Sequence, residues 1–450
     1  MYFLYSVITA AGMILLAPYF AVKGMRTGKY WRNLRERLGK LPPEVIVRAL
    51  GSDGSIWIHA VSVGEVLAVR PLAQQLKQRY PERKLFVSTT TDTGQSLARE
   101  RFDFADGIFY FPLDWSPAVR RAFRAIRPAL VVIVETEIWP NFLREARRRN
   151  VPVVFVNARI SERSFRRSLV GRHMASVFFD RVLSDATLFL AQSDADAERL
   201  RELGAPEDRV EVTGNLKYDG DQPAIGAFGQ WLADQTRTQE RWPVVVAGSV
   251  VADEEEIVIA GYDVVQRQWR HALLILAPRR PDRFDAAVRI AAERGWKVVR
   301  RSTLDLASPL DENADVLILD SIGELAGLYS IADAVFVGGS LVHSGGHNIL
   351  EPAWFGRPPV FGPSMENFRD MAQDFRSEGA GVQVRSGEQL GKTWMELIRD
   401  TPMRERMGQK AKDLAEKNRG ATTRSIERIG AVLAAISVEA SSGAANRGAK

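Results

Sequence analysis

One stretch, Ile56-Trp57-Ile58-His59-Ala60-Val61-Ser62-Val63-Gly64-Glu65, indicates the architecture of the whole chain. It opens with the apolar run Ile56–Val61 and leads into Val66–Gln78, where apolar residues recur with the spacing of a helix. An apolar run without strict alternation of polar residues is typical of a strand that is buried on both faces. The stretch therefore predicts a strand of a parallel sheet, a short turn and a helix that packs on the sheet.

The same succession of a short apolar run and a helical stretch recurs along both halves of the 450-residue chain. In the first half the further runs are Lys84–Ser88, Leu130–Val134, Val153–Val156 and Leu188–Ala191. In the second half they are Val244–Ala247, Ala272–Ala277, Lys297–Val299, Val316–Leu319, Ala334–Val337 and Pro359–Phe361. Strands that alternate with helices predict parallel sheets. We therefore expect two Rossmann-like α/β domains that face one another across a cleft and bind ligands at the carboxyl ends of their strands.

Composition sets the expected domain boundaries. Residues 23–217 form the first domain, and residues 243–436 form the second, whose last helix can cross back to the first. The segment 218–242 contains Asp219-Gly220-Asp221-Gln222-Pro223, which is typical of a linker. The end of the chain, 437–450, is rich in Ser, Gly and Ala and is predicted to be disordered.

The first 22 residues differ in character from the rest of the chain. No charged residue occurs from Tyr2 to Val22, a length sufficient to cross ~30 Å of hydrocarbon as a helix. Seven basic residues and one acidic residue follow between Lys23 and Lys40. Because basic flanks stay on the cytoplasmic side, residues 1–22 are predicted to be a membrane anchor, single-pass or tightly associated, with the remaining chain in the cytoplasm. The alternative is a buried core helix beside a basic surface.

Composition and missing motifs exclude several classes of function. Lys and Arg total 61 against 55 Asp and Glu, a surplus of six that is too small to imply nucleic-acid binding. The chain has no cysteine, which excludes disulfides, thiolate metal sites and cysteine nucleophiles. The histidines lack the spacing of a zinc site, and no G-x-G-x-x-G motif follows the first strand. We therefore expect no nucleic-acid partner, no metal and no cofactor.

Glu65 is the first candidate for chemistry, since it follows a strand and would lie at the mouth of the cleft. A second interpretation fits equally well: Ser62-x-x-Glu65 is a capping box, in which the two side chains satisfy free N–H groups of the helix. A carboxylate at a helix N-terminus is stabilised as the anion, which lowers its pKa and weakens it as a base. A catalytic role would require burial or a nearby anion to offset this effect.

Two further groups of charged residues follow strands of the first half. Glu135-Thr136-Glu137 comes directly after Leu130–Val134 and would share the mouth of Glu65, although a hydrogen-bonded structural turn is the alternative. The arginines around the next strand form a basic arc that could hold anionic groups of an acceptor, or could be a solvated helix face. They are Arg144, Arg147, Arg148, Arg149, Arg159, Arg163, Arg166, Arg167 and Arg172.

Three loops of the second half have the character of a nucleotide-phosphate site. Each follows a predicted strand, and together they offer arginines, glycines that let a phosphate approach the backbone, and helix starts with unpaired N–H groups. Asn348 could alternatively be only a helix cap. The loops are Ala277–Phe284, Asp320–Leu325 and Gly345–Pro352.

At these residues the chain resembles a known family, the 3-deoxy-D-manno-octulosonic acid (Kdo) transferases of lipopolysaccharide synthesis. The resemblance extends from the expected anchor to about residue 430 and rests on five motifs in the order and spacing of the family. They are His59–Glu65, Glu135–Asn141, Asn157–Ser164, Gly214–Asp219 and Gly346–Pro352. The resemblance implies a GT-B fold, a CMP-Kdo donor, a tetra-acylated lipid A precursor as acceptor and a place at the cytoplasmic face of the inner membrane, without a cofactor.

The resemblance also implies roles for individual residues. Glu65 matches the general base, which takes the proton of the acceptor's 6′-hydroxyl as that oxygen attacks the anomeric carbon in one inverting displacement. Glu135 and Lys217 match positions that steady the transition state. The matches to the CMP-binding loops are Pro278, Arg279, Ile322, Gly323, Glu324, Gly346, Asn348, Ile349, Leu350 and Glu351.

Two other functions remain open at this point. A GT-B transferase with a uridine-diphosphate sugar donor would have the same kind of sheets and loops. A membrane-tethered nucleotide- or lipid-binding protein without catalysis would also fit, although the presence of Glu65, Glu135 and Lys217 favours an enzyme.

Overall fold

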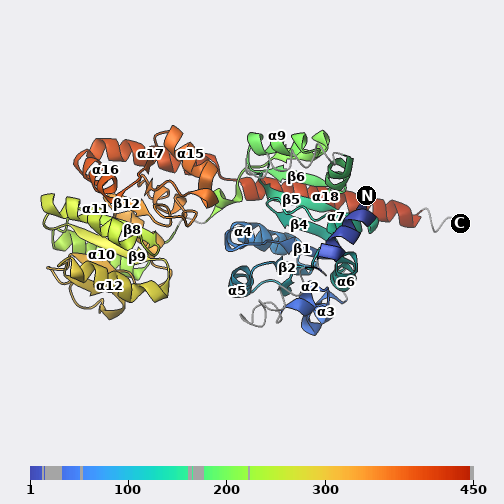
Figure 1. The fold of residues 1–450 in the computed structure, drawn as a ribbon, viewed down its shortest axis with the longest axis horizontal. Helices are drawn as coiled ribbons and strands as arrows, with labels where there is room; N and C mark the ends of the chain where they lie inside the picture. Colours follow the sequence, from blue (N-terminus) through green and yellow to red (C-terminus); the bar gives the residue numbers. More distant parts are fainter. Residues whose placement is uncertain are drawn as a thin grey trace. The chain divides into compact units, whose positions relative to one another are not determined.

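The structure, a computed structural model of the protein, consists of two α/β units (Figure 1). The structure describes residues 1–12, 15, 33–50, 54–160, 165, 177–220 and 223–445. Unit 1 comprises Met1–Gly220 and Asn418–Lys450, and unit 2 comprises Asp221–Lys417. Each unit is built on one seven-stranded sheet.

The sheet of unit 1 has the strand order β3-β2-β1-β4-β5-β6-β7, and its neighbouring strands pair in parallel. The strands are β1 (Ser55–His59), β2 (Leu85–Thr89), β3 (Gly107–Tyr110), β4 (Pro128–Val134), β5 (Val153–Ala158), β6 (Leu188–Ala191) and β7 (Val210–Val212). The carboxyl ends of parallel strands meet at one edge of the sheet, and we call this edge of unit 1 the carboxyl edge.

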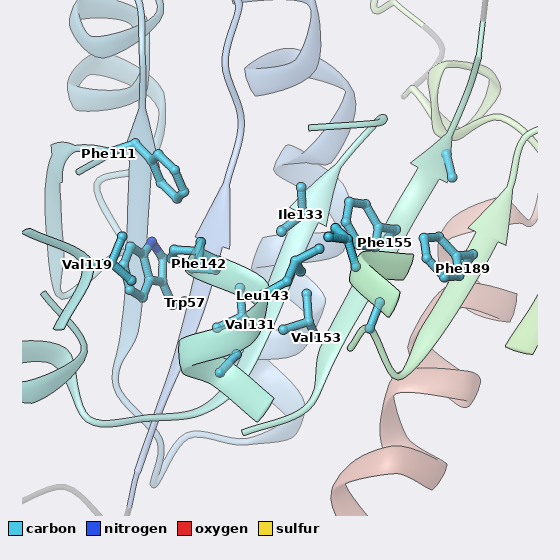
Figure 2. Packing of buried hydrophobic residues seen from close by; sticks show 14 of the residues in the cluster. Trp57, Phe111, Val119, Val131, Ile133, Phe142, Leu143, Val153, Phe155 and Phe189 are labelled. Atoms are coloured by element: carbon cyan, nitrogen blue, oxygen red, sulfur yellow. The ribbon is translucent and has the colours of Figure 1, made fainter. Parts of the chain in front are cut away.

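The strands of unit 1 are mostly apolar because both faces of the sheet are buried. Along β1, Trp57 belongs to one core cluster, whereas Ile56 and Ile58 belong to the cluster on the other face. Trp57 is fully buried and packs edge-on against Phe142 with ring centroids 5.1 Å apart (Figure 2). Its indole N–H donates to Ser88 at 2.7 Å. The hydrogen bond satisfies the one polar atom of this side chain, and so the indole can fill the core without an unpaired donor.

Helices of unit 1 cover both faces of the sheet. They are α2 (Leu34–Arg37), α3 (Pro43–Ala49), α4 (Val63–Arg79), α5 (Asp92–Arg101), α6 (Ser116–Ile126), α7 (Pro140–Arg148), α9 (Asp194–Glu202) and α18 (Ala421–Ala445), with the 3₁₀ turns η1 (Glu207–Arg209) and η2 (Leu216–Asp219). The last of them, α18, comes from the far end of the chain and packs against α4 and η2 (Figure 1).

Unit 2 repeats the plan with the order β10-β11-β9-β8-β12-β13-β14, again with parallel pairing. Its strands are β8 (Val244–Val250), β9 (Leu273–Pro278), β10 (Val298–Arg300), β11 (Val316–Ile318), β12 (Ala334–Val337), β13 (Val360–Phe361) and β14 (Val382–Gln383). Its helices are α10 (Ala227–Thr238), α11 (Glu255–Gln268), α12 (Phe284–Glu293), α13 (Leu325–Leu328), α14 (Leu350–Ala353), α15 (Arg369–Ser377), α16 (Gly387–Arg399) and α17 (Thr401–Lys417). Four 3₁₀ turns, η3 (Pro281–Arg283), η4 (Arg301–Thr303), η5 (Tyr329–Ile331) and η6 (Glu366–Phe368), complete the unit.

Two segments differ from what composition predicted. The expected linker 218–242 contains α10, so the chain folds again soon after it leaves unit 1 at Gly220. Helix α18 continues to Ala445 and so includes residues 437–445, which were expected to be disordered. The remainder of that tail, 446–450, lies outside the described residues.

Residues 2–12 form a helix that lies against unit 1. Tyr2 is buried and donates its hydroxyl to Asp185 at 2.5 Å, and Tyr5 donates to Asp114 at 2.9 Å. Among the described residues, no helix is both long enough and apolar enough to cross a membrane. Residues 13, 14 and 16–22 of the expected anchor lie outside the described part of the chain.

Candidate functional site

Glu65 lies in the first turn of α4, directly beyond the carboxyl end of β1. The Ser62 hydroxyl accepts a hydrogen bond from the Glu65 N–H at 3.4 Å and donates to Oε1 of the same residue at 2.8 Å. Oε2 accepts the N–H of Val61 at 2.7 Å. The capping box that the sequence suggested is therefore formed with one shift, because the carboxylate accepts the N–H of Val61, one residue before the N-cap Ser62. These bonds fix both oxygens of a carboxylate that is only 7% exposed.

The capping role does not leave Glu65 a weak base. Burial and then the negative charges of Glu135 and Glu137 together raise the pKa of Glu65 to about 7, against the hydrogen bonds from Val61 and Ser62 that lower it. A group with a pKa near the working pH is best suited to general acid–base catalysis. Because desolvation outweighs the capping hydrogen bonds, the capping contacts and a raised pKa occur together at Glu65.

Glu135 and Lys217 meet beside Glu65. Glu135 is the first residue after β4 and adopts a left-handed backbone conformation with φ 58°, while its N–H donates to the carbonyl of Val156 at 2.9 Å. The Lys217 ammonium lies 3.8 Å from Oε1 of Glu135. A non-glycine residue in this conformation costs of order 1 kcal/mol, and such residues are enriched at functional sites. The two residues form a pair of opposite charges at the carboxyl edge.

Asn157 is responsible for bringing Lys217 to this edge. Its side chain is fully buried at the end of β5, and its Oδ1 accepts the N–H of Leu216 at 2.9 Å. Asn215 then caps the same turn through the N–H of Lys217, at 2.9 Å. The sequence placed Asn157 in a motif but gave it no role, because only the fold shows that β5 and η2 are adjacent.

Two other residues of the sequence motifs have different environments. His59 is fully buried, stacks on Phe111 with ring centroids 3.7 Å apart, and has a pKa that burial lowers to about 3. It is therefore a neutral core residue. Glu137 is the third carboxylate at this edge, and burial, followed by the charge of Glu135, raises its pKa.

Arg163, Arg166, Arg167 and Arg172 of the expected basic arc lie outside the described residues.

In unit 2, Arg279 and the Gly345–Pro352 loop follow β9 and β12, the two strands that flank β8 in the sheet. Arg279 follows Pro278, the last residue of β9, and its N–H donates to the carbonyl of Val250 at 2.7 Å. The pKa of Glu351 is raised to about 7, because burial outweighs the lowering effects of the Asn348 hydrogen bond and of the Arg279 charge. The same loop holds His347, whose pKa is lowered to about 4 by burial and by the charge of Arg279. The charge of the exposed Arg279 guanidinium therefore acts on both the half-buried Glu351 carboxyl and the neutral His347 imidazole.

The glycine loop itself is tightly built. Gly346 has φ +73°, and a Cβ at this position would lie 2.4 Å from the sulfur of Met365. Asn348 accepts the N–H of Leu350 at 3.1 Å and lies 3.5 Å from Oε1 of Glu351. Ile349 and Leu350 are buried and anchor the loop in the unit. A glycine is therefore required at 346 for backbone conformation and for space.

The third predicted loop follows β11. Glu324 makes a bidentate ion pair with Arg301, with nitrogen–oxygen distances of 3.0, 3.0 and 3.3 Å, and also accepts from Ser321. Gly323 has φ +94°, and Ile322 is 80% exposed. The carboxylate of Glu324 therefore holds the loop in place, while Ile322 offers an apolar surface. The three predicted loops follow the carboxyl ends of β9, β11 and β12 and so lie at one edge of the unit 2 sheet.

Glu254 is a further organising residue, and the sequence analysis missed it. Its carboxylate is fully buried and accepts the N–H groups of Val251 (3.1 Å), Gly339 (2.6 Å), Ser340 (2.8 Å) and Leu341 (2.7 Å). These bonds fasten the turn after β12, from which the glycine loop continues. The run of acidic residues that contains Glu254 is the signature of an exposed surface, and so the sequence held no sign of its burial.

Two parallel α/β units, each with polar loops at the carboxyl edge of its sheet, define a protein of the GT-B type. The complex of S. aureus MnaA with UDP has this fold: it aligns with a TM-score of 0.54 and 14% identity over 84% of this chain and 97% of that one.

Sequence comparison identifies the family. The chain belongs to the 3-deoxy-D-manno-octulosonic acid (Kdo) transferases. It is 32% identical to the 3-deoxy-D-manno-octulosonic acid transferase of Haemophilus influenzae over 94% of this chain and 97% of that protein. It is 31% identical to the transferase of the same name from Bordetella pertussis, over 83% and 86% of the two chains. A sequence model of 3-deoxy-D-manno-octulosonic-acid transferases (kdotransferases) matches residues 32–220.

Proposed function

We propose that the protein transfers Kdo from CMP-Kdo to the 6′-hydroxyl of a tetra-acylated lipid A precursor, with inversion at the anomeric carbon. The observation that carries the proposal is the environment of Glu65: a buried carboxyl, oriented by two hydrogen bonds and with a pKa of about 7, beside the Glu135–Lys217 pair. Membership of the Kdo transferase family supplies the reaction class and the donor sugar.

Each step of the reaction can be assigned to residues of this chain. The Glu65 carboxylate takes the proton of the acceptor hydroxyl, and the oxygen of that hydroxyl forms the new bond to the anomeric carbon. The bond between the anomeric carbon and the phosphate oxygen breaks, and its electron pair leaves with CMP. The transition state has oxocarbenium character. The charge of Glu135 stabilises the anomeric centre, and Lys217 stabilises the donor carboxylate or the departing phosphate.

Unit 2 binds the donor nucleotide in this proposal. Arg279 contacts the phosphate, the N–H groups of the loop after Gly346 add further donors, and Glu351 accepts from ribose hydroxyls. Ile322 packs against the nucleotide. The exposure of Arg279 and the partial burial of Glu351 support these roles, because a phosphate needs an accessible cation and a ribose needs a fixed acceptor.

We also propose that the protein is bound to the inner membrane with both units on the cytoplasmic face. The uncharged stretch Tyr2–Val22 and the seven basic residues between Lys23 and Lys40 support this location. A lipid acceptor that is itself held in the membrane would be reached from there.

Mass spectrometry of the product formed from CMP-Kdo and the lipid A precursor tests the function. We expect the wild-type protein to add Kdo, and Glu65→Gln to lose transfer while it still binds CMP. The matched control is Glu145→Gln, which changes an equally buried carboxylate of unit 1 that is paired with Arg149 instead (2.7 Å). Absence of product with wild-type protein, or tighter competition by UDP than by CMP in a binding assay, would refute the assignment. Near-normal transfer by Glu65→Gln would reduce Glu65 to a helix cap.

A further inference from the structure

The helix formed by residues 2–12 has two faces of opposite character. One face is fixed to unit 1: besides the hydrogen bonds of Tyr2 and Tyr5, Ser6 donates to Oδ1 of Asn141 at 2.7 Å. The other face is apolar and exposed. Its side chains are Phe3 (80% exposed), Leu4 (62%), Val7 (46%) and Ile8 (60%). Four large apolar side chains on one exposed face of one helix are typical of a surface that contacts another apolar phase.

A cavity of about 760 Å³ opens at the start of this helix, and we call it the arginine pocket. Arg144, Arg147 and Arg148 of α7 line it together with Arg181, which comes from the helix at residues 177–183. The Arg144 guanidinium lies 4.4 Å above the ring of Tyr2. The pocket therefore adjoins the helix at residues 2–12 directly.

The arginine pocket carries a surplus of positive charge. The acidic side chains that line it are Asp180 and Asp185, so four arginines against two aspartates give the lining side chains a formal charge of +2. Asp185 is engaged by the Tyr2 hydroxyl at 2.5 Å. The rim also includes Met1 and Val177, which are 65% and 63% exposed. A cationic pocket with an apolar rim matches a charged group that is attached to a hydrocarbon chain.

The arginine pocket is separate from the candidate active site. Helix α7 begins at Pro140, soon after Glu135, and its nine residues extend about 13 Å away from there. Arg147 and Arg148 lie at its far end, from which the chain continues to the start of β5 at Val153. Since a crossover helix returns from the carboxyl ends of the strands to their amino ends, the pocket lies at the edge of the sheet opposite Glu65.

We propose that the arginine pocket binds the phosphate of an anionic phospholipid, and that the helix at residues 2–12 lies in the plane of the membrane surface. Phe3, Leu4, Val7 and Ile8 enter the acyl region, and the guanidinium groups pair with the headgroup phosphate. This inference rests on the proposed membrane location and makes it specific: one helix face supplies the apolar contact and the pocket supplies selectivity for acidic lipid.

Vesicle binding by the full-length protein tests the proposal. The vesicles are phosphatidylcholine alone, or phosphatidylcholine mixed with phosphatidylglycerol. Since each basic residue near an anionic surface contributes roughly fivefold, R147Q/R148Q should bind the mixed vesicles about 30-fold more weakly than wild type. Its binding to phosphatidylcholine alone should not change. The matched control R289Q/R406Q, which removes the same charge from exposed positions of unit 2, should differ from wild type by about twofold or less on both.

A second pair of substitutions separates the apolar contribution from the charge. Phe3→Ser with Ile8→Ser should weaken binding to both kinds of vesicle, because the lost contact does not depend on the headgroup. Thermal unfolding of each variant shows whether unit 1 stays folded, and only folded variants are compared. Equal binding of R147Q/R148Q and R289Q/R406Q to the mixed vesicles would overturn the proposal.

Kdo transfer in neutral detergent distinguishes this inference from the proposed function. We expect R147Q/R148Q to keep the wild-type KM for the lipid acceptor there, because no anionic phospholipid is present. A raised KM in that assay would overturn the proposal, since the pocket would then bind the acceptor. Failure of the wild-type protein to transfer Kdo would refute the proposed function and leave the lipid-binding result valid.

Discussion

The hydroxyl of Ser62 controls how much of Glu65 is ionised, and its removal gives the sharpest test of the catalytic proposal. It donates to Oε1 of Glu65 at 2.8 Å, and this bond is one of the contributions that lower the pKa of the carboxyl against the effect of burial. A hydrogen bond to an ionised group stabilises the ionised form. Ser62→Ala therefore raises the pKa of Glu65 above its value of about 7.

The size of the effect follows from the strength of the lost bond. A hydrogen bond to a charged group contributes about 1.5–3 kcal/mol, which corresponds to roughly one to two pKa units. Part of this is recovered when water replaces the hydroxyl, and so we expect a shift of about one unit. A base with a pKa near 7 is half ionised at pH 7, whereas with a pKa near 8 it is about one-tenth ionised. The rate at pH 7 should therefore fall about fivefold, and the rate near pH 9 should hardly change.

The measurement is the pH profile of kcat/KM for Kdo transfer between about pH 5 and pH 9, where the acid limb reports the pKa of the base in the free enzyme. Ser193→Ala is the matched control: in α9, Ser193 accepts from the N–H of Asp196 at 3.2 Å and donates to its carboxylate at 2.7 Å, the same capping arrangement. The control should lose a similar amount of stability, about 1 kcal/mol, and keep the wild-type profile. A loss for Ser62→Ala that is the same at every pH would refute the reasoning.

Three further outcomes are expected. The pKa of Glu65 is about 7 in the folded protein and 4.5 ordinarily, so between these pH values the folded wild type binds more protons than the unfolded chain. Its free energy of unfolding should therefore fall by about 3 kcal/mol as pH rises through that window. Urea unfolding at several pH values should show this decrease for the wild type and not for Glu65→Gln. Gly346→Ala should weaken CMP binding, measured by calorimetry, at least about tenfold, since its Cβ would meet the Met365 sulfur at 2.4 Å. The control Gly295→Ala should not weaken it, because Gly295 has a similar φ of +83° but no heavy atom near the position of a Cβ. Glu254→Gln should destabilise unit 2 by about 3 kcal/mol in urea unfolding. The carboxylate uses two oxygens to accept four N–H groups, whereas an amide has only one acceptor oxygen. An unchanged urea midpoint would contradict the role of Glu254 in holding the turn after β12.

Most strands were predictable from their apolar runs, whereas β3, β7 and β14 match none of the predicted runs. The apolar run Leu130–Val134 became β4, where Val131 and Ile133 lie in one core cluster and their neighbours lie in the other. Such a run has one physical interpretation, a strand covered on both faces, once its length excludes a helix. The segment 218–242 was only partly predictable. Its turn residues at 219–223 mark where the chain leaves unit 1, but they do not indicate that the helix α10 follows directly.

Positions along the strands also predicted part of the candidate site. Glu65 and Glu135 follow neighbouring parallel strands, so their proximity could be inferred from strand order alone. Lys217 could not be placed in this way, because it reaches Glu135 only through the buried side chain of Asn157. The pKa of Glu65 could not be inferred either: the sequence shows the capping bonds that lower it, whereas the burial that outweighs them depends on the whole unit.

The return of α18 makes unit 2 an insertion within unit 1. Asp219 accepts the N–H of Gly420 at 2.6 Å, so the point where the chain leaves unit 1 is next to the point where it comes back. Ile426, Ile429 and Leu433 then complete the core on one face of the sheet. A fragment that ends at Gly220 would therefore expose that core to water. A chain in which Gly220 is spliced directly to Asn418 would retain the covering helix, and unit 1 could be isolated and studied without unit 2.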